Sequence, residues 1–366
     1  MRFTCQQRDL NNAIQNALRA VPTRSTIPAL ESLLIEAKNN RVTVTGYDGE
    51  MAICSYVDAT VSEDGRYLFN AKRFSDIIKK LSDDVMTFFL KEGTEVCIEC
   101  GESVVHLSAS TAATYPELPA FDKDKVLVME QKTFSDMVRA TQYAASDDTA
   151  RGIMQGIKVS VEDNVMEMVG IDGYRISLRR EYLKGESPDM EFVVPKKAMR
   201  ELHRIFNEKD SQLNICPTEK FILFETDNNI LLCRLMEGTY LEYKGLLPDS
   251  KKTEIVLNRG EFARSVERAF LLIDENIRRY PITLTNVENT LLISTMTGIG
   301  SLQDKIGITF SGEQLDLDFD PLYFSDALKH LTDEEIKIEF NGTNGPCFIK
   351  PLEGDKYICM LLPLRR

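Results

Sequence analysis

The sequence predicts an α+β fold in which one unit occurs three times, each copy having two helices against antiparallel sheet. Three observations predict it: a strand-helix pattern that recurs, a second helix that recurs at similar intervals, and hairpin patterns between the two helices. Self-similarity at a fixed interval is typical of a repeated architecture. The 366 residues, 43% of them hydrophobic, are enough for two or three cores at roughly 100 to 150 residues per domain.

Each copy begins with a short alternating strand followed by an amphipathic helix. Leu10, Phe134 and Phe262 occupy matching places in this pattern, at steps of 124 and 128 residues. The three stretches are FTCQQRDLNNAIQNA (3–17), VMEQKTFSDMVRATQ (128–142) and VLNRGEFARSVERA (256–269).

A second helix recurs further along each copy. Phe74, Ala198 and Phe324 take matching places, at steps of 124 and 126 residues, and in the first and third copies apolar residues follow helical spacing. The stretches are NAKRFSDIIKKL (70–81), VPKKAMRELHRI (194–205) and DPLYFSDALKHL (320–331).

Hairpins are predicted between the two helices, because alternating apolar and polar residues flank polar turns at Asn40, Asn164 and Asn289. Each hairpin is followed by a glycine, at positions 49, 173 and 298, for which we predict a positive φ.

An Asp precedes this glycine in the first two copies, in GYDGEM and GIDGYRIS, but the third copy has Thr297. Asp48 and Asp172 are therefore interpreted as turn-stabilising residues, with a catalytic role as the alternative. The residues after the glycine differ between copies. In the second copy Tyr174 and Arg175 follow it, and we predict that these two residues carry recognition.

The cysteines and the chain's hydropathy limit the classes of function. The eight cysteines lie mostly in apolar, strand-like runs, so we expect buried free thiols. The pair Cys97-Ile-Glu-Cys100 lacks the second pair that a zinc site requires, and no metal or cofactor is expected. Because no apolar run is long enough for a transmembrane helix and the N-terminus has no signal-peptide core, a cytoplasmic protein is expected.

Charge is segregated between helices and the rest of the chain. The six predicted helical segments contain 16 Lys and Arg against 8 Asp and Glu, a net of +8, so the remainder carries −21 of the total of −13. This predicts a face for a polyanion, bound through phosphates without sequence specificity, although basic side chains that merely solvate helices are the alternative. The candidate DNA-binding residues are Arg24, Lys72, Arg73, Lys79, Lys80, Arg151, Lys196, Lys197, Arg200 and Arg204.

An ordered set of motifs resembles one family from end to end: MRFT, TIPALESLLIEA (26–37), GYDGEM, STAATYPELP (110–119), GIDGYRIS, EGTYLEYKGLLP (237–248) and LLPLRR. They are similar to the bacterial sliding clamp, the beta subunit of DNA polymerase III. The resemblance implies a non-catalytic processivity factor of DNA replication. It further implies a head-to-tail homodimeric ring whose helices surround duplex DNA, and partners such as the replicative polymerase, the clamp loader and other proteins that bind through a short linear motif.

The resemblance also implies a partner-peptide pocket and a ring interface. Three pocket positions depart from the family's best-known members: Tyr174 replaces His, Leu241 replaces Pro and Ile171 replaces Thr. The implied pocket residues are Met154, Ile171, Gly173, Tyr174, Arg175, Ile176, Leu241, Leu246, Asp320, Tyr323, Pro346, Met360, Leu362, Pro363, Leu364 and Arg365. The implied interface residues are Val105, Leu107, Leu271 and Leu272, for which intramolecular core is the alternative.

Charged, turn-rich stretches near residues 120–125 and 248–253 predict domains 1–122, 123–250 and 251–366. Two other functions stay open at this point. One is a hydrolase or lyase that uses Asp48, Asp172 and Arg175, although no nucleophile-base pair accompanies them. The other is a monomeric peptide-binding scaffold that never encloses DNA.

Overall fold

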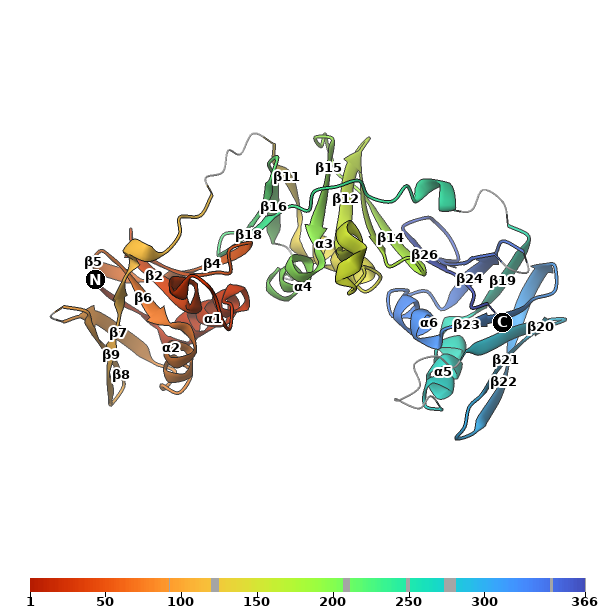
Figure 1. Ribbon diagram of the computed structural model, residues 1–366, viewed down its shortest axis with the longest axis horizontal. Coiled ribbons are helices and arrows are strands. Elements are labelled where there is room, and N and C mark those ends of the chain that lie inside the picture. Colours follow the sequence, from red (N-terminus) through yellow and green to blue (C-terminus); the bar gives the residue numbers. More distant parts are fainter. Residues whose placement is uncertain are drawn as a thin grey trace. The chain divides into compact units, whose positions relative to one another are not determined.

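The computed structural model describes residues 1–366 except 92, 120–124, 207–210, 248–250, 273–280, 343–344 and 366. The chain divides into two compact units. Unit 1 contains Met1–Thr133 and Glu201–Leu235, and unit 2 contains Phe134–Arg200 and Met236–Arg366. Both consist of antiparallel sheet and helices, which confirms the predicted α+β class (Figure 1). None of the described helices is long and apolar enough to cross a membrane.

The helices lie where the sequence predicts them, and three of them begin at a capping side chain. Asn70 accepts a hydrogen bond from the N–H of Arg73, Asn258 from Glu261 and Asp320 from Leu322. The six α-helices within the described residues are α1 (Gln7–Ala17), α2 (Ala71–Ile78), α3 (Gln131–Gln142), α4 (Lys196–Ile205), α5 (Arg259–Phe270) and α6 (Pro321–Leu328).

In the part of unit 1 that the structure describes there are two antiparallel sheets. The five-stranded sheet has the order β5-β1-β7-β8-β9, with β1 (Arg2–Gln6), β5 (Thr60–Glu63), β7 (Val85–Leu90), β8 (Glu95–Cys100) and β9 (Ser103–Ser108). The nine-stranded sheet has the order β10-β6-β2-β3-β4-β18-β17-β16-β11. Its strands are β2 (Ser32–Lys38), β3 (Arg41–Tyr47), β4 (Met51–Asp58), β6 (Gly65–Asn70), β10 (Ser110–Thr111), β11 (Leu127–Glu130), β16 (Gln212–Pro217), β17 (Phe221–Glu225) and β18 (Asn229–Arg234).

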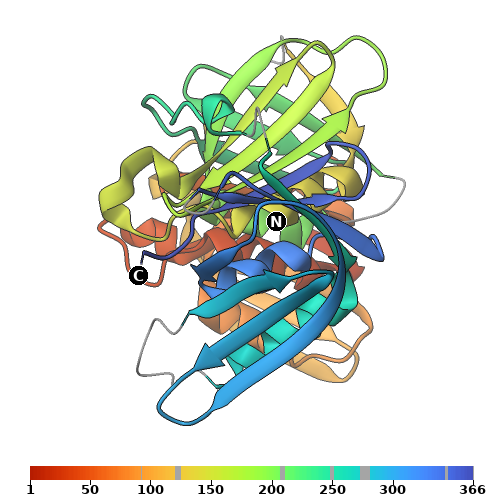
Figure 2. The same cartoon turned by 90° about the vertical axis from the view of Figure 1, so that its right-hand side faces the viewer.

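The described residues of unit 2 form a single antiparallel sheet in the order β15-β12-β13-β14-β26-β25-β24-β19-β22-β21-β20-β23. The long strand β22 and its partner β21 form the blue hairpin in the lower half of Figure 2. The strands are β12 (Gly156–Glu162), β13 (Val165–Ile171), β14 (Arg175–Tyr182), β15 (Met190–Pro195), β19 (Thr253–Asn258), β20 (Ile282–Val287), β21 (Thr290–Met296), β22 (Ser301–Gly312), β23 (Asp316–Phe319), β24 (Glu335–Phe340), β25 (Cys347–Pro351) and β26 (Tyr357–Leu361).

The residues that mark the repeat are core residues. Phe74 is fully buried and stacks on Phe69 at 4.7 Å between ring centroids, and Phe324 is fully buried edge-on to Phe262 at 5.2 Å. The remaining marker positions are also buried, as are all eight cysteines. Burial raises the pKa of the Cys5 and Cys359 thiols to about 12, which makes these two side chains unreactive hydrophobes.

The two glycine positions of the Gly-x-Asp-Gly motif each require glycine, but for different physical reasons. Gly49 and Gly173 have φ values of +96° and +89°, as predicted, whereas the prediction for Gly298 stays untested. The first glycine of the motif is required by close packing. A Cβ at Gly46 would lie 2.0 Å from the carbonyl oxygen of Ala17, at the end of α1. A Cβ at Gly170 would lie 2.2 Å from the carbonyl oxygen of Thr141 in α3.

Neighbouring sequence copies are joined by strand pairing. In unit 1, β4 pairs with β18, and the N–H of Arg234 donates to the carbonyl of Glu50 at 2.9 Å. In unit 2, β14 pairs with β26, and the N–H of Leu362 donates to the carbonyl of Tyr174, also at 2.9 Å. We call β4 and β18 with the turn 48–51 the first junction, and β14 and β26 with the turn 172–175 the second junction. This pairing explains why three sequence copies give two compact units.

Candidate functional site

The second junction's turn is built on Asp172. Its Oδ1 accepts the backbone N–H of Tyr174 at 2.9 Å and of Arg175 at 3.0 Å. Asp48 makes the same pair of bonds, at 2.9 and 2.7 Å, in the first junction. The interpretation of both carboxylates as turn-stabilising residues is confirmed.

Arg175 is buried beneath this turn, with only 9% of its surface exposed. Its Nε donates to Asp172 Oδ2 at 2.9 Å, Nη1 to Asp326 Oδ2 at 2.8 Å, and Nη2 to the Tyr143 carbonyl at 2.8 Å. The guanidinium carbon lies 4.5 Å from the ring centroid of Tyr323 and 5.2 Å from that of Tyr143. The side chain is therefore fixed by a planar set of bonds between two aromatic rings.

The charge of Arg175 is retained despite its burial. Burial alone would lower the pKa of the guanidinium, but the hydrogen bond that it donates to Asp326 and the negative charges of Asp172 and Asp326 outweigh this effect, and the pKa is raised. The turn and α6 are thus connected by a permanent cation between two carboxylates.

A cavity of about 690 Å³ opens next to this ion pair. Three segments line it: the turn wall (Gly173 and Tyr174), the helix wall (Asp318, Asp320 and Tyr323) and the tail wall (Leu362–Arg365). Pro281 completes the lining. The volume is in the range that binds small molecules and short peptide segments.

The three walls are connected in pairs. The N–H of Leu362 donates to the Tyr174 carbonyl at 2.9 Å and joins the tail wall to the turn wall. The N–H of Leu364 donates to the Asp318 carbonyl at 2.7 Å and joins the tail wall to the helix wall. The ion pair between Arg175 and Asp326 joins the turn wall to the helix wall. Each wall is therefore held by two links.

An apolar cluster lies in the same unit, on and beside the strands that form the second junction. It includes Ile171, Ile176 and Met360, and the half-buried Ile153 and Leu247 pack against it. The nearby segment 240–247 leaves two leucines, at 241 and 246, exposed by 39% and 45%. Exposed leucines beside an apolar cluster provide a surface for further apolar groups.

The structure brings together half of the sequence-predicted pocket residues in one cavity: Gly173, Tyr174, Asp320, Tyr323, Leu362, Pro363, Leu364 and Arg365. Ile171, Ile176 and Met360 belong to the apolar cluster instead, and Met154, Leu241, Leu246 and Pro346 do not line the cavity. Sequence reasoning missed Pro281 and Asp318. No sequence signal singled out either residue.

Arg175 and Arg151 both make internal contacts that the sequence does not predict. Arg175 is buried under the cavity and contributes to its support, and its part in direct recognition stays a prediction. Arg151 is placed among the candidate DNA-binding residues, but its Nη1 donates to the Asp172 carbonyl and its guanidinium carbon lies 5.2 Å from the Tyr174 ring centroid. Both arginines support the turn wall because their donors match carbonyl and carboxylate groups in the turn.

The other basic candidates lie on or next to helices. Lys196 is half-buried, and its Nζ donates to the Ala145 carbonyl and to Asp147, each at 2.8 Å, so its ammonium group is used inside the protein. The remaining eight side chains are exposed: Arg24, Lys72, Arg73, Lys79, Lys80, Lys197, Arg200 and Arg204. Arg19, which the prediction omitted, pairs with Glu201 at 3.1 Å.

The predicted interface residues divide into two groups. Val105 and Leu107 lie on the edge strand β9, but both are half-buried and pack against the core of the first copy, in agreement with the alternative reading. The outward-facing valine of β9 is Val104, which is 58% exposed. Leu271, at the end of α5, is 79% exposed, and Leu272 is half-buried.

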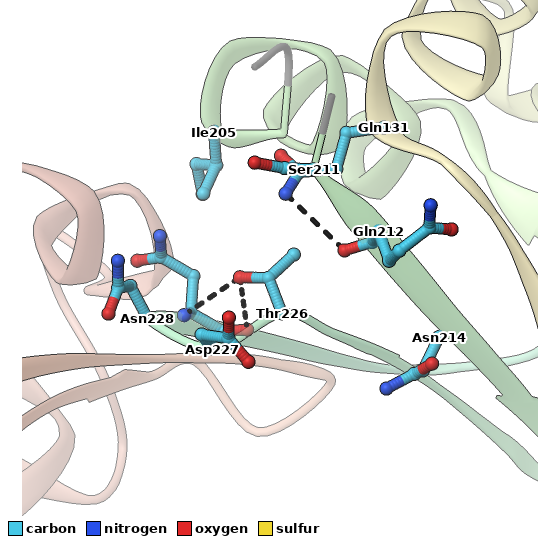
Figure 3. A pocket seen from close by; sticks show the side chains of 9 residues that line it. Gln131, Ile205, Ser211, Gln212, Asn214, Thr226, Asp227 and Asn228 are labelled. Carbon is cyan, nitrogen blue, oxygen red and sulfur yellow. Dashed lines mark hydrogen bonds between the residues drawn. The ribbon is translucent and has the colours of Figure 1, made fainter. Parts of the chain in front are cut away.

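A second cavity, of about 400 Å³, lies in unit 1 (Figure 3). It lies between the start of α3, the start of β16 and the turn between β17 and β18, and amide and hydroxyl side chains line most of it. Gln131 and Thr226 form internal hydrogen bonds there, to Gln212 and Asn229 respectively. Its lining contains one charged residue, Asp227, and we identify no chemistry there.

Known proteins share the whole of this architecture. Models of the DNA polymerase III beta subunit match the chain in three parts: the N-terminal domain at residues 1–119, the central domain at 128–242 and the C-terminal domain at 244–365. A beta sliding clamp of Staphylococcus epidermidis is 29% identical over 374 residues, covering 100% of this chain and 99% of that protein.

Solved structures agree. A DNA polymerase sliding clamp from Bacillus subtilis is 29% identical with a TM-score of 0.96, covering 100% of this chain and 99% of that one. A sliding clamp from Pseudomonas aeruginosa bound to griselimycin, 22% identical, shares the fold with a TM-score of 0.94 over 100% of both chains.

Three similar α+β domains, joined by strand pairing and carrying exposed basic helices, define a protein of the DNA-clamp architecture. The chain belongs to the bacterial DNA polymerase III beta subunit family, the sliding clamps that act as processivity factors in DNA replication. The resemblance inferred from the sequence motifs is confirmed.

Proposed function

We propose that two copies of this protein form a head-to-tail ring around duplex DNA, and that the cavity of the second junction receives short peptides from the replicative polymerase, the clamp loader and other partners. The ring is supported by two strand edges that have no strand partner within the described residues: the edge of residues 301–307 in β22 and the edge of β9. The proposal involves no catalytic step, because the carboxylates of Asp48 and Asp172 stabilise turns.

The two junctions of one chain predict a third between chains. β4 pairs with β18, and β14, 124 residues later, pairs with β26. In the third copy, residues 301–307 of β22 are equivalent to β4 and β14. In the first copy, β9 is equivalent to β18 and β26. Within the described residues, 301–307 and β9 each have a strand partner on one side only. Pairing of β22 with β9 of a second copy continues the series and covers both edges.

The ends of the first helices support the same arrangement. Arg19, Tyr143 and Leu271 occupy equivalent positions, at steps of 124 and 128 residues. Arg19 forms its ion pair with Glu201 across the first junction, and Tyr143 stacks on His330 across the second, with ring centroids 5.1 Å apart. Leu271 is 79% exposed, so we infer that it makes the corresponding contact across the ring interface with a second copy.

DNA contacts are assigned to the eight exposed basic residues on and beside the helices. Single contacts to phosphates are weak and salt-dependent, and they carry no sequence information. In a closed ring, retention comes from enclosure, so weak contacts permit sliding. The three domains are assigned to residues 1–122, 123–250 and 251–366, the boundaries that the sequence predicts.

The ring is tested by the mass in solution. The chain has a mass of 41.5 kDa, and we expect twice that value at micromolar concentration. A charge placed on the free edge, in Val104→Asp, should shift the mass toward the monomer, because an unpaired charge opposes strand pairing. A wild-type mass of one chain would support the monomeric scaffold instead.

The cavity is tested with overlapping short peptides that together cover the replicative DNA polymerase of the same organism. The peptide that binds the wild type most tightly, labelled with fluorescein, is called the polymerase peptide. Leu364→Ala removes part of the tail wall and should weaken its binding by about tenfold, because one buried apolar anchor contributes about 1.5–3 kcal/mol. Unchanged binding in this variant would place the peptide elsewhere.

A further inference from the structure

We infer that Asp326 is a positioning residue for the peptide cavity, acting through Arg175 on the distance between the turn wall and the helix wall. Asp326 does not line the cavity. The inference rests on the proposed function, because it concerns the affinity of that cavity for a peptide.

The geometry connects Asp326 to two lining residues. Tyr323 is three residues before Asp326 on α6, so both side chains lie on one face of the helix. The guanidinium of Arg175 occupies the space behind Tyr323, 4.5 Å from its ring centroid, while Nη1 holds Asp326 at 2.8 Å. On the other side, Nε of Arg175 holds the turn that places Tyr174. One rigid side chain thus contacts both walls from behind.

The sequence repeat separates this role from a general role in joining domains. At the first junction the positions equivalent to Arg175 and Asp326 hold Met51 and Arg200, and at the proposed ring interface they hold Gly300 and Asp76. Neither pair joins a cation to a carboxylate. The first junction nevertheless has the same strand pairing and the same Asp turn. The ion pair is therefore present where the cavity is, and it is not a requirement for strand pairing at a junction.

The same carboxylate provides a matched control. Lys329 contacts the other oxygen of Asp326 at 3.3 Å, but its side chain is 63% exposed. Removing it in Lys329→Gln leaves the Arg175 link in place. A solvent-exposed pair of this kind contributes little. Asp326→Asn also weakens this contact with Lys329, so any effect that comes from losing the contact would appear in Lys329→Gln as well.

The experiment measures the affinity of the polymerase peptide for the full-length protein by fluorescence anisotropy, at a temperature where unfolding curves show every variant folded. Asp326→Asn keeps the shape and removes the charge, and should weaken binding on the order of tenfold. Lys329→Gln should stay within about twofold of the wild type. Wild-type affinity in Asp326→Asn would overturn the inference.

A double-mutant cycle distinguishes positioning from general stability. If Asp326 acts through the placement of Tyr323, then Asp326→Asn should weaken binding much less in a Tyr323→Leu background than in the wild type. Additive effects would contradict the inference.

If Asp326→Asn does not fold, Asp326→Glu supplies the test, since it keeps the charge but moves it by one methylene. Weaker binding is expected, and wild-type affinity would overturn the inference. Failure of the proposed function looks different: either no polymerase peptide binds the wild type, or Leu364→Ala leaves binding unchanged.

Discussion

The two junctions use one backbone plan with different side chains. Both pair a strand of one copy with a strand of the next copy, and in both an Asp oxygen accepts hydrogen bonds from two successive backbone N–H groups. The first junction continues with Glu50 and a buried Met51, whereas the second continues with Tyr174 and a buried Arg175. The shared part therefore builds a joint between domains, and the part that differs builds a cavity. Four predictions examine this division, from the largest expected effect to the smallest.

Replacing Arg175 with Met gives the second junction the residue of the first. Two half-buried carboxylates, Asp172 and Asp326, then lose their common cation, and removing one partner of a buried ion pair typically costs about 3–5 kcal/mol. Urea unfolding should show a loss of this size. The double variant with Asp326→Ala should recover part of it, because one unpaired carboxylate is gone. A loss below about 1 kcal/mol in the single variant would mean that the ion pair does not hold the junction.

Acid should destabilise the second junction through His330. Burial, followed by the charge of Arg139, lowers the pKa of this imidazole to about 4, below its usual 6.5. The unfolded chain therefore takes up the proton first. The neutral imidazole's contribution to stability is complete above about pH 6.5 and is lost as the pH falls toward 4, by about 3 kcal/mol.

The repeat has Arg204 at the position of His330, so the first junction lacks this titration. His330→Gln should make the free energy of unfolding less dependent on pH than that of the wild type in this window. Urea unfolding at several pH values checks it, and parallel pH curves for the two proteins would refute it.

The two turn aspartates should differ in their effect on stability. Asp48→Ala removes two hydrogen bonds to backbone N–H groups, and we expect a loss of about 1 kcal/mol. Asp172→Ala removes the same two bonds and also the ion pair with Arg175, so about 2–3 kcal/mol is expected. Thermal and urea unfolding provide both values. Equal losses would show that the ion pair with Asp172 adds nothing to the turn.

The smallest effect is expected for alanine at the glycine of each turn. Gly49→Ala should cost about 1 kcal/mol, because φ is +96° but the new Cβ meets nothing within 4 Å. Gly173→Ala should cost slightly more, since its Cβ would lie 2.1 Å from Nη1 of Arg151, which must move. The order of the two unfolding midpoints tests the comparison, and a larger loss at Gly49 would reverse it.

The sequence predicts the elements and the repeat of this protein but not the contacts between distant side chains. Strand-helix starts, hairpins and turn aspartates depend on spacing within one copy, so Leu10 and Asp48 fall where they are expected. The hydrogen bond between Arg175 and Asp326 joins residues that are 151 positions apart, so the pattern of residues within one copy does not predict it. The same holds for Lys196, whose ammonium group donates hydrogen bonds to the Ala145 carbonyl and to Asp147.

One signal in the sequence does point to the ion pair. Aligning the copies shows Met51, Arg175 and Gly300 in one column and Asp76, Arg200 and Asp326 in another. When the residues are paired across each junction, the second junction is the one that combines a cation with a carboxylate. The ion pair is therefore indicated by comparing residues that face each other across a junction, and not by comparing equivalent residues of the three copies.

Topological retention is the most direct test of the clamp. The protein is loaded on nicked circular DNA by the clamp loader of the same organism with ATP, and the circle is then cut once with a restriction enzyme. Gel filtration separates DNA-bound from free protein. The ring predicts that protein stays with the closed circle and is released after the cut, at low as well as moderate salt. Equal retention on circular and linear DNA would contradict enclosure of the duplex.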